Sequence, residues 1–158
     1  MGLAKQSKVL NKQQIEFVST YLRSKRNGLR NQTIFLLSVK SGLRAKEISQ
    51  LSWREVLNSE GTIDTHINLT NQSSKGNSGR CIPLHKLVRR NLAEMYEYQS
   101  MFRYFDPKTS FVIRTERSPF TTSQTIVNMF QKWYSTLGLI GCSSHSGRRT
   151  FITETAKK

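Results

Sequence analysis

Apolar residues recur at helical spacing through the first third of the chain. Asn11 can cap a helix, because Gln14 follows three residues later and completes the pattern of a capping box. The apolar positions of this helix are Ile15, Val18, Tyr21 and Leu22. The polar stretch 24–28 ends it, and the apolar run 33–39 then predicts a buried helix that stops at Gly42.

The stretch 43–51 predicts a short third helix, after which the pattern changes. Apolar and polar residues alternate over 62–69, and an extended pattern resumes over 80–84. The serine, asparagine and glycine residues at 73–79 are typical of a turn between two strands. The sequence therefore predicts a small antiparallel sheet, with Lys75 at or near the tip of its hairpin.

Four further elements are predicted after the hairpin. They are a helix over 87–98, a short strand over 111–113, a helix capped by Thr121 or Thr122 and ending at Gly138, and a last helix from near Ser144. No internal repeat or linker divides the chain, and 158 residues can bury one core. We expect a basic leader at 1–10 and one domain at 11–158, mainly α with a small antiparallel β-sheet (α+β).

Charge gives the first indication of function. The chain has 25 Lys and Arg residues against 10 Asp and Glu residues, a formal net charge of +15. A chain with this charge is expected to bind a polyanion. Nucleic acid is favoured over a membrane because the charges are spread rather than gathered on one amphipathic helix.

Cys81 and Cys142 lack metal-ligand spacing, so free thiols in a reducing cytoplasm are expected rather than zinc. No signal peptide or membrane-spanning stretch is evident.

Four cationic positions have settings suited to phosphoryl transfer. Arg44 follows a predicted helix end, Lys75 lies among small polar residues, and His145 and Arg148 are three apart near a helix start. Two guanidinium groups can hold phosphate oxygens, while a lysine and a histidine can move protons, so the set needs no metal or cofactor. Each could also have an ordinary structural role, such as an ion pair between Arg44 and Glu47.

Three segments, 41–48, 74–84 and 145–151, resemble in order and spacing the signature boxes of tyrosine recombinases, the phage integrase family. The resemblance extends from about residue 10 onward. It implies that Arg44 and Arg148 clamp the scissile phosphate, that Lys75 is the general acid for the 5′-oxygen, and that His145 assists proton transfer. In this family a tyrosine attacks the phosphate and forms a 3′-phosphotyrosine link without ATP or metal.

The resemblance is incomplete at both ends. The family has a second His or Trp and then the nucleophilic tyrosine downstream of 145–151, whereas this chain stops at Lys158 and its five tyrosines all come earlier. Because the resemblance begins at about residue 10, we also expect residues 1–158 to lack the family's N-terminal DNA-clamping domain. We therefore expect the double-stranded-DNA-binding catalytic domain of a site-specific recombinase, intracellular and associated with the nucleoid, and unable to cleave DNA alone.

Other hypotheses stay open. One is a cleavage-inert DNA-binding regulator of recombination sites, and another is a type IB topoisomerase-like domain. A basic RNA-binding module has less support, because no RNP-type or KH-type pattern occurs. The target DNA sequence, and whether further recombinase protomers join the chain on DNA, are left undetermined by the sequence.

Overall fold

The computed structural model describes residues 6–70 and 79–157, and within these ranges it contains six α-helices, one short 3₁₀ helix and two β-strands. In chain order they are α1 (Lys12–Arg23), α2 (Gly28–Ser41), α3 (Ala45–Gln50), η2 (Trp53–Glu55), β1 (His66–Leu69), β2 (Arg80–Pro83), α4 (Lys86–Gln99), α5 (Ser123–Thr136) and α6 (Ser146–Ala156). The prediction of a mainly α fold with a small antiparallel sheet is confirmed.

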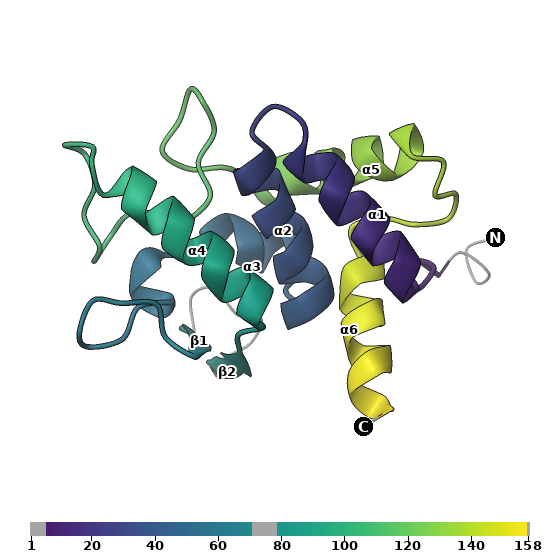
Figure 1. Ribbon diagram of the computed structural model, residues 1–158, viewed down its shortest axis with the longest axis horizontal. Coiled ribbons are helices and arrows are strands. Elements are labelled where there is room, and N and C mark those ends of the chain that lie inside the picture. Colours follow the sequence, from purple (N-terminus) through teal and green to yellow (C-terminus); the bar gives the residue numbers. More distant parts are fainter. Residues whose placement is uncertain (1–5, 71–78, 158) are drawn as a thin grey trace.

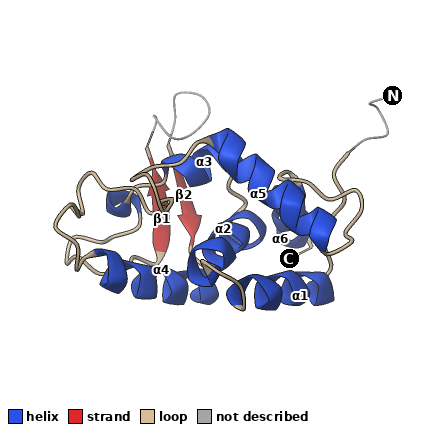
Figure 2. Ribbon diagram, turned by 90° about the horizontal axis from the view of Figure 1, so that it is seen from above, coloured by secondary structure: helices blue, strands red, loops and turns tan. Residues whose placement is uncertain are grey.

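Helix α2 lies in the middle of the molecule and contacts α1, α3, α4 and α6 (Figure 1). Seen from above, α1 and α4 form a layer on one side of α2, and α3 and α5 lie on the other side (Figure 2). This position explains the composition of α2, since a helix covered on several sides is apolar around most of its circumference.

Local signals place most helix ends. The Asn11 side chain accepts a hydrogen bond from the Gln14 backbone N–H, and the Gln14 side chain accepts one from the Asn11 N–H, which confirms the predicted capping box. Thr122, rather than Thr121, caps α5 through a bond from the Thr125 N–H. Helix α2 begins at Gly28, earlier than the apolar run indicates. The tight turn after α1 requires a glycine there, because a Cβ would overlap the backbone of Arg23.

The predicted sheet is a two-stranded antiparallel pair. β1 and β2 pair with Ile67 opposite Ile82 and Leu69 opposite Arg80. Ile67, Leu69 and Ile82 are buried, so this face of the hairpin covers the core. Lys75, expected near the hairpin tip, lies outside the described residues.

The strand expected over 111–113 is not present. Phe111 forms a single isolated bridge with Ser52, and the Val112 N–H donates to the Leu51 carbonyl at 2.9 Å. The Val112 carbonyl accepts a hydrogen bond from the Gln99 side chain at 2.9 Å. Val112 and Ile113 are buried, but they lie in irregular backbone. The backbone polar groups of Val112 are satisfied by a loop and a side chain rather than by a neighbouring strand.

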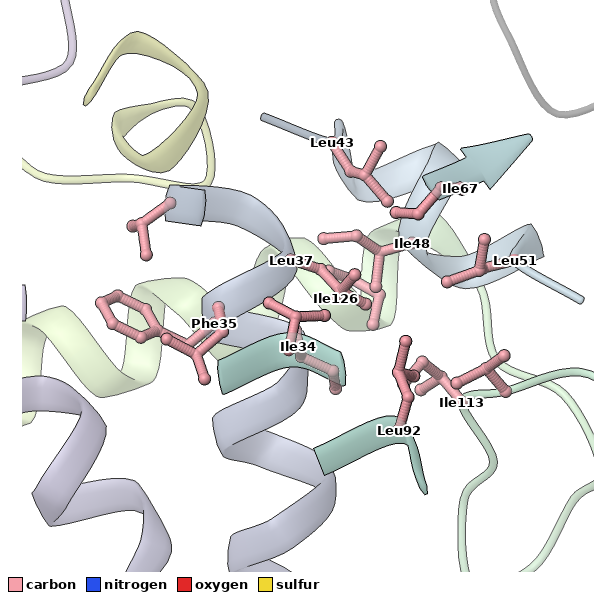
Figure 3. Close-up of a cluster of buried hydrophobic side chains, with 14 of the residues drawn as sticks. Ile34, Phe35, Leu37, Leu43, Ile48, Leu51, Ile67, Leu92, Ile113 and Ile126 are labelled. Carbon is pink, nitrogen blue, oxygen red and sulfur yellow. The ribbon is translucent and has the colours of Figure 1, made fainter. Parts of the chain in front are cut away.

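The core draws on nearly every element. Figure 3 shows Ile34 and Leu37 of α2 beside Ile48 of α3 and Ile126 of α5, with Leu92 of α4 close by. All five side chains are fully buried. Because α3 is packed on both α2 and α5, the junction between α2 and α3 is held rigidly, and the chain segment that carries Arg44 is held with it.

Helices α2 and α6 approach closely because small residues line their contact. A Cβ on Gly147 would overlap the side chain of Ser38, and one on Gly42 would overlap the ring of Phe151. Gly42 also has a left-handed backbone with φ 70°, and its N–H donates back to the Ser38 carbonyl, which ends α2. This contact brings the first turn of α6 beside the α2–α3 junction.

The residues before α1 also pack on the domain. Leu10 is 2% exposed, and its N–H donates to Thr150 Oγ1 at 2.9 Å. The Lys8 N–H donates to the Gly141 carbonyl at the same distance. The end of the basic leader is therefore bound to the second turn of α6 and to the loop that precedes this helix.

Candidate nucleic-acid interface

Arg44 stands where α2 gives way to α3. Its backbone is extended, with φ −78° and ψ 159°, and it occupies the position just before the first turn of α3. The left-handed turn at Gly42 and the buried side chain of Leu43 fix the direction in which the chain leaves α2. The Arg44 side chain is 39% exposed, so its guanidinium group can reach a ligand from solvent.

Glu47 is the buried carboxylate around which the local arginines gather. Its side chain is 2% exposed. Oε1 accepts the Arg44 backbone N–H at 2.9 Å and Arg80 Nη2 at 3.1 Å. Oε2 lies 3.0 Å from Arg80 Nη1 and 3.6 Å from Arg44 Nη1. A carboxylate with this little solvent needs positive charge beside it, and Arg80 supplies the closer of the two.

Arg148 joins this cluster from the first turn of α6. Its Nη1 donates to the Gly42 carbonyl at 2.7 Å. Partial burial lowers the pKa of the Arg148 guanidinium, the positive charges of Arg44 and Arg80 lower it further, and Glu47 acts in the opposite direction. An arginine keeps its proton near neutral pH, so Arg148 remains a cation in the neighbourhood of Arg44, Arg80 and Glu47.

The arrangement suits an anion with several oxygen atoms. Arg44 and Arg80 form ion pairs with the single carboxylate of Glu47, while Arg148 donates to a backbone carbonyl, so the cluster carries more positive than negative charge. Planar guanidinium groups present forked N–H donors that match phosphate oxygens. The cluster can therefore bind a phosphodiester by hydrogen bonding and by charge.

Of the other two predicted site residues, the structure describes only His145. His145 is the exposed residue just before α6, one helical turn from Arg148. Lys75 belongs to the segment outside the described residues. The structure thus brings Arg44 and Arg148 together, and it places His145 on the same helix turn as Arg148.

Arg80 was not among the site residues predicted from the sequence. Burial alternates along β2, with Ile82 buried and Cys81 and Pro83 exposed. Because side chains alternate between the faces of a strand, Arg80 shares the inward side with Ile82. A charged residue at an inward position requires a buried counter-charge. The inward position of Arg80 in its strand was therefore the signal that could have identified it as a site residue.

The cluster lies outside the main hollows on the described part of the molecule. Two larger hollows occur on the described part of the molecule, of about 600 Å³ beside Arg30 and Gln99 and about 990 Å³ beside Ile15 and His85. None of the clustered arginines lines either hollow. An exposed, positively charged site fits the backbone of a large polyanion better than it fits a small molecule, which binds in concave pockets.

Neither a metal-binding cluster nor a membrane-spanning helix occurs among the described residues. Over 6–70 and 79–157, no group of three His, Cys, Asp or Glu side chains is arranged to hold a metal ion. Across the same ranges, no helix has both the length and the apolar character needed to cross a bilayer.

Comparison with known proteins gives one family. The family model described as "Phage integrase family" matches residues 8–158. No curated protein is significantly similar to the chain.

Solved structures of tyrosine recombinases share the fold. The Tn1549 transposon integrase in complex with circular intermediate DNA matches with a TM-score of 0.69 and 18% identity, over 94% of this chain and 52% of that one. XerA recombinase matches with a TM-score of 0.74 and 16% identity, over 95% of this chain and 50% of that one. XerH recombinase bound to its difH substrate matches with a TM-score of 0.71 and 18% identity, over 97% of this chain and 44% of that one. The chain therefore spans about half the length of these structures, and identities this low establish the fold alone.

Replacing the central carboxylate should destabilise the protein. We expect Glu47→Ala to lower the free energy of unfolding by about 2–3 kcal/mol, since it leaves Arg80 and the Arg44 N–H without their partner. Urea unfolding followed by circular dichroism measures this. Glu94→Ala is the control, because Glu94 also binds an arginine, Arg23, but both side chains are about half exposed.

The control should change the unfolding free energy by no more than about 0.5 kcal/mol. Equal losses for the two variants would show that Glu47 is no more than an ordinary surface ion-pair partner.

Proposed function

Because the chain belongs to the phage integrase family and has the fold of a tyrosine-recombinase catalytic domain, we propose that it binds duplex DNA as the phosphate-holding part of a site-specific recombinase. The observation that carries this proposal is the cluster of Arg44, Arg80 and Arg148 around the buried Glu47. The net charge of +15 supports it, since binding to DNA phosphates neutralises positive charge.

Two structural neighbours support DNA as the partner, and we propose that this DNA is double-stranded. The Tn1549 integrase was solved with circular intermediate DNA, and XerH with its difH substrate in a pre-cleavage complex. We propose that such DNA binding associates the protein with the nucleoid, and that other recombinase protomers on the same DNA are candidate partners.

In the proposed reaction, Arg44 and Arg148 donate hydrogen bonds to the two non-bridging oxygens of the scissile phosphate. These donors stabilise the negative charge that grows on the oxygens as a nucleophile attacks phosphorus. His145, exposed beside Arg148, is proposed to donate to the same phosphate or transfer a proton. The attacking tyrosine oxygen forms a bond to phosphorus, the bond to the 5′-oxygen breaks, and Lys75 is proposed to protonate that leaving oxygen.

The tyrosines of this chain are poor candidates for the nucleophile. Tyr134 is 1% exposed, and burial raises the pKa of its hydroxyl, which opposes formation of a phenolate. Tyr96 packs edge-on against Trp53, and the other three make ring contacts on α1 or near the end of α4. We therefore propose that the nucleophile is supplied from outside residues 1–158 and that this chain alone does not cleave DNA.

Arg148 should matter more for DNA binding than an isolated surface arginine. We expect Arg148→Ala to weaken binding to a labelled duplex about tenfold and to reduce the slope of log affinity against log salt by about one, since one charged phosphate contact is lost. Fluorescence anisotropy over a salt series measures both quantities.

Arg90→Ala removes the same charge from the exposed face of α4 and is the control. It should lower the affinity by less than about twofold, because a single exposed charge away from the contact is screened by salt. Equal effects would show that the chain binds DNA only through its total charge.

A suicide-substrate assay tests the enzymatic part of the proposal. Nicked duplex DNA, from which the cleaved fragment escapes, is incubated with residues 1–158 and with a version extended past Lys158 by its own coding sequence. We expect a covalent protein–DNA adduct with the extended form only. Adducts from neither form, despite tight and salt-sensitive binding, would support a cleavage-inert DNA-binding protein instead.

A further inference from the structure

Arg80 is held at the base of the hairpin by the pairing of its strand. It lies opposite Leu69 in the antiparallel register and on the same side of β2 as the buried Ile82. Its side chain is 30% exposed, well below the value for a free surface arginine. The strand therefore directs a guanidinium group toward the core, where it meets Glu47.

The contact between Arg80 and Glu47 uses both ends of each group. Nη1 lies 3.0 Å from Oε2, and Nη2 donates to Oε1 at 3.1 Å. The Arg44 guanidinium lies farther from the same carboxylate, at 3.6 Å. Glu47 is thus paired first with Arg80, and Arg44 is its nearby second cation.

We propose that Arg80 is a positioning residue whose charge satisfies Glu47 and thereby leaves the Arg44 guanidinium available for phosphate. This inference rests on the proposed function, since it assigns a role within the same site. Arg80 acts through Glu47 and Arg44 and does not itself bind the phosphate.

The physical reason is the cost of an unpaired buried carboxylate. Glu47 is 2% exposed, so without Arg80 its charge would have almost no solvent around it and only the Arg44 guanidinium, 3.6 Å away, as a charged partner. Arg44 is 39% exposed and needs only a small movement to close its 3.6 Å separation from Oε2. A guanidinium group drawn fully onto Glu47 offers fewer N–H donors, and less net charge, to a phosphate.

Arg80 could alternatively touch the phosphate directly, and the two roles differ in how substitutions combine. A direct contact contributes equally whether or not Glu47 is charged. A positioning role depends on that charge, because a neutral Glu47 does not draw Arg44 away. Non-additivity between substitutions at Arg80 and Glu47 therefore distinguishes the two roles.

The test is a double-mutant cycle with Arg80→Gln and Glu47→Gln, read out as affinity for a labelled DNA duplex at fixed salt. Gln at position 47 can still accept the Arg44 N–H. We expect Arg80→Gln to weaken binding about tenfold in the wild-type background and less than about twofold in the Glu47→Gln background. The same loss in both backgrounds would overturn the positioning role.

Two controls separate the positioning role from a change in net charge and from a loss of folding. Glu97→Gln on the exposed face of α4 changes the net charge by the same amount as Glu47→Gln but lies outside the cluster. Arg80→Gln should therefore still weaken DNA binding about tenfold in the Glu97→Gln background. Thermal unfolding by circular dichroism identifies any variant that does not fold. If Glu47→Gln fails to fold, Arg44→Ala takes its place, since a residue that acts through Arg44 has no further effect once Arg44 is removed.

The outcome also distinguishes failure of the positioning role of Arg80 from failure of the proposed DNA-binding function. Additive losses with normal wild-type binding reject the role of Arg80 and leave the DNA-binding function standing. A wild-type chain that does not bind duplex DNA at all rejects the proposed function itself.

Discussion

The site depends on one buried negative charge. Glu47 lies on α3, whose apolar residues are packed between α2 and α5, so the carboxylate cannot move out to solvent. It ties the Arg44 backbone on one side and the Arg80 guanidinium on the other. A residue in the core thereby sets the positions of charged groups at the surface, and the junction of α2 and α3 is joined to the hairpin.

The second constraint is the close contact of α2 with α6. Gly147 and Gly42 have no side chains, and in each case a Cβ would overlap a residue of the opposing helix. The resulting approach lets Arg148 donate to the Gly42 carbonyl, although 106 positions separate the two residues in the sequence. Two guanidinium groups from distant segments can then face one anion, which neither helix could achieve alone.

The sequence was most informative where the signal was local. The Asn11 capping box, the glycine at the end of α2 and the Thr122 cap depend on residues within a few positions of one another, and the structure confirms them. The strand predicted over 111–113 was wrong because apolar and aromatic residues indicate burial, whereas a strand also requires a partner. Whether a partner is present is decided by tertiary structure.

The candidate site likewise combines residues that local sequence signals identify with contacts that only the tertiary structure determines. The spacing of the motifs identified Arg44 and Arg148 as site residues. Their proximity, however, results from helix packing that no local sequence pattern predicts. Arg80 was overlooked because its inward orientation depends on the register of β2 against β1. Its contact with Glu47 then depends on how the sheet packs against α3.

The most direct test of this account is a crystal structure of the chain with a short DNA duplex. The account predicts a backbone phosphate within hydrogen-bonding distance of both the Arg44 and Arg148 guanidinium groups, with Arg80 still paired to Glu47. A duplex bound through another face, with Arg44 and Arg148 turned to solvent, would contradict it.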